Sequence, residues 1–413
     1  MRRRGTSGSL GSLRELNRGR VVQTLRGLGI ASRAEIARRT GLSRSTVSSL
    51  VADLKEEGLI VERTGGRAPG GAAGQSGRPP VLIALSRSAG VVIGIDFGKR
   101  HLAVAVSDLS HEVLAESWRE MPEDYAGGQG MDTACDLADA ALAEAGAGRD
   151  RVLGVGLGLP GPIHRLTGMI GSPAILPGWV GIRVAEEMAE RLGLPIHVDN
   201  DANLGALSEY HWGAGGASGS LAYLKVATGI GAGLVVDGRL FHGAGGTAGE
   251  IGHTTIDENG PICRCGRRGC LETFAAAPAV VELLRPSLGA DLTVEAVLER
   301  ARNGDPGCQR AIADAGRHIG QALGNLCNLI NPERIVVGGS MGAAGDVLLD
   351  PIREAVERAA IPSAANDVDI VPGVLGERAE LLGAVGLVLH DEDGAPAQPV
   401  GEPVAAVGIP EPA

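Results

Sequence analysis

The stretch AGEIGHTTIDENGPICRCGRRGCLETFAA, residues 248–276, constrains the structure of this chain more tightly than any other. It places His253, Cys263, Cys265 and Cys270 in the pattern His-x9-Cys-x-Cys-x4-Cys. One imidazole and three thiolates form a donor set that suits a closed, tetrahedral zinc site. The alternative is three unrelated reduced thiols, which the close spacing disfavours. The sequence therefore predicts a structural zinc knuckle from His253 to Cys270, with no open position for catalysis.

The other cysteines and the distribution of apolar residues indicate where the protein is located and what its cysteines do. Cys135, Cys308 and Cys327 lie in apolar helical patterns, so we expect them in the core. No apolar run reaches the ~20 residues of a membrane span, and the basic N-terminus lacks the apolar segment of a secretory signal. We therefore expect a cytoplasmic protein with no membrane partner, where cysteines serve as metal ligands or core residues instead of forming disulfides.

Charge is unevenly distributed along the 413 residues. Residues 1–90 hold 16 basic and 6 acidic side chains, a net charge of +10, and the remainder has a net charge of −21. A basic head on an acidic body suggests that the head meets a polyanion, although a solvated charged face is the alternative. We expect a head with a basic N-terminal arm over residues 1–87, a body over residues 88–390, and a disordered Pro- and acid-rich tail over residues 391–413.

Residues 31–60 of the head predict two helices joined by a short turn. Ser32 and Glu35 have the spacing of a capping box, Gly41 ends the first helix, and a second helix follows Ser43. Its apolar face, spaced as in a helix, comprises Val47, Leu50, Val51 and Leu54. Its opposite face suits phosphates and base edges in a major groove and comprises Arg44, Ser45, Thr46, Ser48 and Ser49.

A two-stranded hairpin around a Gly-rich loop, residues 65–77, follows these helices. This pattern is typical of the wing of a winged helix-turn-helix. Arg63, Arg67 and Arg78 border or occupy the loop, where they would reach DNA phosphates or a narrow minor groove. The alternative is a helical hairpin with a structural role. Because one short recognition helix reads few base pairs, we expect a two-fold symmetric DNA operator bound by a homodimer or homotetramer.

From residue 88 on, strands and helices alternate as in an α/β fold. Together, these motifs resemble the ROK family, which comprises repressors, open reading frames and sugar kinases. The resemblance covers nearly the whole chain, and the winged head is similar to the repressor branch. It implies an α/β body of two actin-like lobes with ribonuclease-H-like topology. In that family the sugar lies in the cleft between the lobes, and the kinases bind ATP beside it.

The resemblance also implies which residues would bind a sugar. Glu250 and Glu272 match positions that hydrogen-bond sugar hydroxyls, and His253 would serve zinc with one ring nitrogen and the sugar with the other. Asp201 matches the general base of the kinases, and Asn200 would contact the sugar. Taken alone, the segment Asn-Asp-Ala-Asn would be better explained as a turn between a strand and a helix; the knuckle and a further loop favour sugar binding. The segment GVGLGLPGPI, residues 154–163, resembles the sugar-side loop of the family.

The resemblance to the kinases breaks at the first phosphate loop. The kinases carry Asp-x-Gly-Gly-Thr, whereas this chain has Asp96, Phe97, Gly98, Lys99 and Arg100. Long side chains replace a glycine and a threonine where the backbone must approach phosphates closely. A second departure is Ile175, where the kinases usually have an Asn sugar contact. Two further Gly-rich turns survive as ATGIGAG, residues 227–233, and VVGGSMG, residues 336–342.

These observations predict a sugar-responsive DNA-binding transcriptional regulator, expected to be a repressor, with a degenerate kinase body as its sensor. We expect no catalytic activity, structural zinc, and a sugar or sugar phosphate as the effector. One alternative is an active ATP-dependent sugar kinase with a DNA-binding head. Another is a regulator that senses no effector and uses its body only to dimerise.

Overall fold

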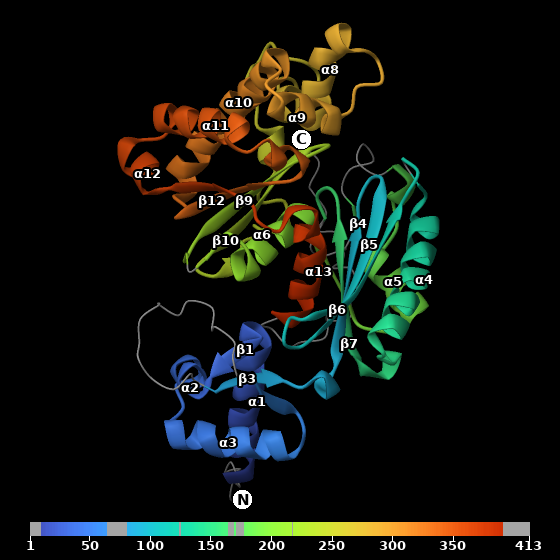
Figure 1. Cartoon of the computed structure of the whole chain (residues 1–413), viewed down its shortest axis with the longest axis vertical. Coiled ribbons are helices and arrows are strands. Elements are labelled where there is room, and N and C mark those ends of the chain that lie inside the picture. The colour runs from blue at the N-terminus through green and yellow to red at the C-terminus, as the bar shows by residue number, and fades with distance from the viewer. Residues whose placement is uncertain are drawn as a thin grey trace, which may run out of the picture.

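The computed structural model describes residues 10–63, 81–123, 125–163, 169–170, 177–216 and 218–390. A small head and two larger lobes follow one another along the chain, and the head lies at one end of the molecule (Figure 1). No helix in these ranges has the length and apolar composition that a membrane span requires.

The head is a winged helix-turn-helix. Its elements are α1 Leu10–Leu28, β1 Ile30–Ser32, α2 Arg33–Thr40, α3 Arg44–Glu56, β2 Ile60–Arg63 and β3 Leu82–Leu85. The sheet is antiparallel with the order β1-β3-β2. Ser32 caps α2 by accepting a hydrogen bond from the backbone N–H of Glu35 at 3.2 Å, and Gly41 ends that helix in the left-handed conformation. Both helices and their caps confirm the sequence prediction, and the four expected apolar residues of α3 are buried.

Part of the basic N-terminal arm expected from the sequence is a helix, since residues 10–28 form α1. Val21 and Leu25 of this helix are fully buried in the core of the head. The spacing of apolar residues does not predict this helix, because Leu13 and Leu16 in its first half are more than half exposed and form no buried face. Arg67, Arg78 and the tip of the wing lie outside the described residues.

Each lobe is built on a five-stranded sheet, and the two sheets share one topology. The first has the order β6-β5-β4-β7-β8 and the second β11-β10-β9-β12-β13. In both, the first three strands in that order are antiparallel and the remaining pairings are parallel. This repetition confirms the two-lobed, actin-like body that the sequence predicts.

The first lobe packs two helices on one face of its sheet (Figure 1). Its elements are β4 Val91–Phe97, β5 His101–Asp108, β6 Val113–Glu120, α4 Gly127–Ala145, β7 Val152–Leu159, α5 Val184–Leu192 and β8 Ile196–Asn200. The second lobe comprises β9 Leu221–Val226, β10 Ile230–Val236, β11 Arg239–Leu240, α7 Glu272–Ala275, α8 Ala277–Leu288, α9 Val294–Arg302, α10 Pro306–Ile330, β12 Arg334–Gly338, α11 Asp346–Ala359, α12 Pro362–Asp367 and β13 Asp369–Pro372.

Two helices, α6 Asp201–Trp212 and α13 Ala379–Leu389, cross between the sheets. A Cβ on Gly156 would lie 1.9 Å from the carbonyl oxygen of Ala384, and one on Gly383 would lie 2.0 Å from that of Leu204. Side chains at these two glycines would therefore push α13 away from the first sheet and from α6. The close contacts hold α13 tightly against the first sheet and against α6.

The head shares its apolar core with the first lobe. Val21 and Leu25 of α1 belong to the same buried cluster as Leu381, Val385 and Val388 of α13. Between β3 of the head and β4 of the body the chain makes only a short turn, Arg87–Ala89. A movement of α13 would therefore displace the side chains of the head that pack against it.

Candidate functional site

The exposed face of α3 is the candidate DNA-binding surface. Ser43 caps the helix by accepting from the N–H of Thr46 at 3.1 Å, and the hydroxyl of Thr46 lies 2.7 Å from that of Ser43. Arg44 is exposed and makes no ion pair with any residue that the structure describes. By contrast, Arg18 and Arg38 of the head are paired with acidic side chains. Among the cations of the head that the structure describes, Arg44 is therefore the one most available to an external anion.

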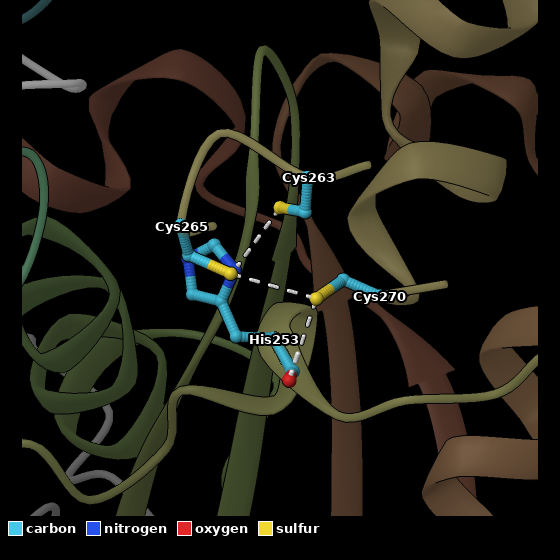
Figure 2. A group of neighbouring side chains, drawn as sticks. All are labelled: His253, Cys263, Cys265 and Cys270. Carbon is cyan, nitrogen blue, oxygen red and sulfur yellow. Dashed lines mark hydrogen bonds between the residues drawn. The ribbon is translucent and has the colours of Figure 1, made fainter. Parts of the chain in front are cut away.

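The zinc ligands predicted from the sequence lie together in one cluster (Figure 2). All four candidate ligand atoms are within 4.8 Å of one another. The Nδ1 atom of His253 lies 3.6 Å from the Sγ atom of Cys263, and the sulfurs of Cys265 and Cys270 are also 3.6 Å apart. A tetrahedron with Zn–S bonds of about 2.3 Å has S···S edges of about 3.8 Å. The donor set and its spacing therefore fit a tetrahedral metal ion.

The second ring nitrogen of His253 faces a carboxylate. Its Nε2 atom lies 3.9 Å from an oxygen of Glu250, whereas Nδ1 faces the sulfurs. Burial, followed by the negative charges of Asp201 and Glu272, raises the pKa of Glu250 to about 7. The structure therefore brings these four predicted sugar-site residues into one neighbourhood.

Asn200 is the N-cap of α6. Its Oδ1 atom accepts from the N–H of Ala202 at 2.9 Å, and its Nδ2 atom donates to the carbonyl of Gly161 at 2.8 Å. Asn200 thereby ties the loop after β7 to the start of α6. A primary amide has two N–H donors, so one remains for a ligand. Ile175 lies outside the described residues.

Lys225 contacts both α6 and α13, and the motif analysis missed it. Its Nζ atom lies 2.9 Å from Asp201 Oδ2 and 3.1 Å from Glu380 Oε1 of α13. Burial alone would lower the pKa of Lys225, but the charges of Asp201 and Glu380 outweigh it and hold that pKa well above its usual value. One oxygen of Asp201 is therefore engaged by a permanent cation. A lysine inside an apolar strand was the available signal in the sequence.

His101 covers the first phosphate loop, and the motif analysis missed it as well. Its Nε2 atom lies 2.8 Å from Oδ2 of Asp96. A Cβ at Gly98 would lie 2.1 Å from the imidazole ring, and the hydroxyl of Tyr125 donates to the carbonyl of Gly98 at 3.0 Å. The space above the glycine is thus filled by the protein itself, in addition to the long side chains at 99 and 100.

The second phosphate loop holds an internal carboxylate. The N–H of Ile230 donates to Glu272 Oε2 at 3.1 Å, and Arg264 donates to the same oxygen at 2.8 Å. A Cβ at Gly229 would lie 2.6 Å from this oxygen and 2.8 Å from a terminal nitrogen of Arg264. An N–H of this loop therefore already has an anionic acceptor.

A group of aromatic rings joins the head to the body. His111 Nε2 lies 2.6 Å from the carbonyl of Arg26 in α1, and Trp212 donates to His111 Nδ1 at 2.8 Å. The rings of His211 and His390 stack with centroids 3.5 Å apart. We call these five residues the joint. Since the carbonyl accepts and the indole donates, His111 is held as the neutral tautomer with its proton on Nε2.

Models of two protein families match the chain, one over the body and one over the head. The model of the ROK family matches residues 92–391. The chain belongs to the ROK family. The model of the MarR family matches residues 20–68, which lie within the winged head.

ROK proteins of two kinds are similar to this chain. A xylose repressor of Caldicellulosiruptor bescii is 30% identical over 394 residues, covering 92% of this chain and 96% of the repressor. A glucokinase of Halalkalibacterium halodurans is 34% identical over 318 residues, covering 73% of this chain and 96% of the glucokinase. The crystal structure of a ROK family transcriptional regulator, a homologue of the Escherichia coli MLC protein, has a TM-score of 0.72 and 25% identity, covering 92% of this chain and 97% of its own. The regulators thus match head and body together, whereas this glucokinase leaves about a quarter of the chain unmatched.

Proposed function

We propose that this protein is a transcriptional repressor that binds operator DNA through its head and responds to a sugar in the cleft of its body. The observation that carries this proposal is the winged head joined to a ROK body through one continuous core. The relatives that share both parts are named as a repressor and a transcriptional regulator. We expect cooperation between two copies on a symmetric operator, since a single α3 contacts few base pairs.

In the head, Arg44 would contact a base or a phosphate from the exposed side of α3, with Ser45, Ser48 and Ser49 beside it. These short hydroxyl side chains allow the helix to approach the floor of a groove closely. Thr46 contributes to the cap of the helix, so its role at DNA would be to hold α3 in place. The wing would add contacts outside the major groove.

In the body, sugar hydroxyls would bind among Asn200, Asp201, Glu250, His253 and Glu272. Ionised carboxylates only accept hydrogen bonds, and sugar hydroxyls are the donors they lack. Together with the three knuckle cysteines, His253 would hold zinc through Nδ1. Its Nε2 atom would donate a hydrogen bond to the sugar. Zinc would keep the knuckle folded and leave the ring no freedom to turn.

Three contacts argue against phosphoryl transfer. Lys225 is paired with Asp201, the position of the kinase base. His101 fills the space over Gly98, and Glu272 accepts from the second phosphate loop. The cation on Asp201 would weaken it as a base, and a nucleotide would have to displace His101 and Glu272 from the two phosphate loops. We therefore favour a sensor over an enzyme for this body.

The experiment begins with selection of genomic DNA fragments by the purified, zinc-containing protein, followed by fluorescence anisotropy on the selected site. A panel of sugars and sugar derivatives is then titrated into the complex, with and without ATP. We expect one class of sugar to change DNA affinity about 5–150-fold and no ATP to be consumed. Robust ATP-dependent phosphorylation, or the absence of any selected DNA site, would contradict the proposal.

A matched pair of variants localises the response. Glu250→Ala combined with Glu272→Ala should abolish the sugar response and leave DNA binding near normal without sugar. The control is Glu282→Ala combined with Glu295→Ala, two acidic residues of α8 and α9 that take no part in the cleft, which should respond like the wild type. A full response in the Glu250 and Glu272 variant would place the effector elsewhere.

A further inference from the structure

The turn between β5 and β6 of the first lobe packs against the head. This turn comprises residues 109–112. A Cβ at Gly29, which lies between α1 and β1, would be 2.9 Å from the carbonyl oxygen of Ser110 and 2.9 Å from Nδ1 of His111. On the other side of its ring, His111 lies 2.6 Å from the carbonyl oxygen of Arg26. The turn is therefore fitted closely to the end of α1.

Two arginines bind carboxylates at this turn. Arg63, the last residue of β2, donates to Glu112 Oε2 at 3.2 Å and to the hydroxyl of Ser110 at 3.2 Å. Arg87, between head and body, donates to Glu112 Oε1 at 2.5 Å. The Nε atom of Arg87 also lies 3.6 Å from Oδ2 of Asp108, whose side chain is fully buried. Glu112 of the body thus joins the root of the wing to the start of the body.

Arg63 stands where β2 leads into the wing. It pairs with Leu82 of β3, and the Gly-rich loop expected to form the wing connects these two residues. Successive side chains of a strand face opposite sides. Glu62 accepts from Arg33 and Lys55 within the head, whereas Arg63 reaches the body. A guanidinium at this root is suited to a DNA phosphate, but here a carboxylate of the body binds it.

We propose that Glu112 holds Arg63 away from DNA, so that the body restrains the affinity of the head. This inference rests on the DNA-binding part of the proposed function and concerns its regulation. A carboxylate and a DNA phosphate compete for the same guanidinium. The side chains of Arg63 and Glu112 are 38% and 44% exposed, and an ion pair with this exposure is weak enough to be exchanged. On release, Arg87 would keep its place beside Asp108, so Arg63 is the cation that becomes available.

Strand β5 connects this contact to the first phosphate loop. Its first residue, His101, lies 2.8 Å from Asp96 and covers Gly98. Its last residue, Asp108, leads into the turn. Eight residues of extended chain span roughly 25 Å. A ligand that displaced the first end of β5 would therefore change the position of the turn against the wing root, by a route separate from α13.

The test measures DNA affinity of the full-length, zinc-containing protein by fluorescence anisotropy on the selected site, from about 50 to about 200 mM salt. Glu112→Gln should bind at least ~3-fold more tightly at the lowest salt, and its affinity should fall more steeply with salt, by about one phosphate contact. Arg63→Met alone should stay within about 2-fold of the wild type, because Arg63 is held by the body. Combined with Glu112→Gln, it should remove the gain.

Glu116→Gln is the matched control. Glu116 also lies on β6, and its carboxylate accepts from Arg378 of the body at 2.6 Å, so the variant removes the same charge without touching the head. It should bind DNA like the wild type, and zinc content and Tm verify that every variant is folded. An unchanged or weaker affinity in Glu112→Gln, an equal gain in Glu116→Gln, or a gain that persists in the double variant would overturn the inference and leave DNA binding intact. Absence of DNA binding in every form would overturn the proposed function as well.

Discussion

Lys225 shows how individual residues decide between a kinase and a sensor. Its ammonium ion joins Asp201 at the start of α6 to Glu380 on α13, residues 179 positions apart in the chain. Sequence motifs mark Asp201 because its neighbours form a pattern, but they do not reveal that a lysine 24 residues later pairs with it. The same holds for His101 above Gly98. Motifs therefore singled out Asp201 and Gly98, and the structure was needed to show that Lys225 and His101 lie against them.

The first prediction concerns the buried charges around Lys225. Lys225→Met should destabilise the protein by about 3 kcal/mol, because it leaves the carboxylates of Asp201 and Glu380 together without a cation. Urea unfolding measures the change. Lys55→Met, which removes a surface ion pair with Glu62, should cost less than about 1 kcal/mol. Adding Glu380→Gln to Lys225→Met should restore part of the loss. A stable single variant would show that this contact is not a charge pair in solution.

The second prediction concerns the knuckle. Purified protein should contain one zinc ion per chain, and Cys265→Ser should lose it together with much of the stability of the second lobe, since metal binding is coupled to folding. Metal analysis by mass spectrometry gives the stoichiometry. Cys135→Ser, which changes a cysteine in α4 outside the cluster, should retain the metal. Protein that is fully folded without zinc would contradict the structural role.

At the scale of elements, caps and apolar spacing in the sequence predicted helices better than they predicted contacts between side chains. Caps and apolar spacing identified α2 and α3, because their buried faces are continuous in sequence. The same approach missed α1. Between residues 13 and 28 of this helix the fully buried side chains are Val21 and Leu25, and their packing partners come from distant segments, including α13. Helices that are stabilised mainly by tertiary contacts have weak local signals.

The third prediction belongs to α3. Arg44→Ala should weaken binding to the selected DNA site by roughly 1–3 kcal/mol if the side chain contacts a base. The loss on DNA of unrelated sequence should be smaller, because a base contact adds specificity beyond the attraction to phosphates. Fluorescence anisotropy on both DNAs separates these effects. Unchanged affinity for the selected site would remove Arg44 from the interface.

The fourth prediction belongs to the joint, where α1, α6 and α13 meet. Burial lowers the pKa of His211 to about 4 and also lowers those of His111 and His390. Neutral forms are therefore favoured in the folded state. The buried neutral imidazoles therefore contribute fully to the free energy of unfolding above the unfolded pKa of ~6.5. This contribution is lost as the pH falls toward 4. His211 alone would contribute on the order of 3 kcal/mol over this interval.

The joint is tested by measuring Tm between pH 7.5 and pH 4.5 in the wild type and in His211→Phe with His390→Phe. Phenylalanine keeps the ring contact and cannot be protonated. The wild type should lose more stability on acidification than the variant, and Arg26 and Trp212 remain in place in both. Parallel pH profiles would show that these imidazoles do not titrate on unfolding.

At the scale of the whole molecule, the repeated sheet topology and the shared core connect three functions. The two lobes have the same sheet topology, α13 lies between them, and the head packs on α13 (Figure 1). Sequence resemblance predicted the lobes and the head as separate units. It did not predict that their cores merge, because this depends on how distant apolar faces meet.

The fifth prediction follows from that connection, and it tests the central claim that one ligand in the body changes how the head reads DNA. The measurement is calorimetric titration of the active sugar form into the protein with and without its selected DNA. Reciprocity requires DNA to change the affinity for the sugar by the same factor, about 5–150-fold, by which the sugar changes the affinity for DNA. We expect the two factors to agree. A sugar affinity that is identical in the presence and absence of DNA would contradict the account, because the cleft and the head would then be uncoupled.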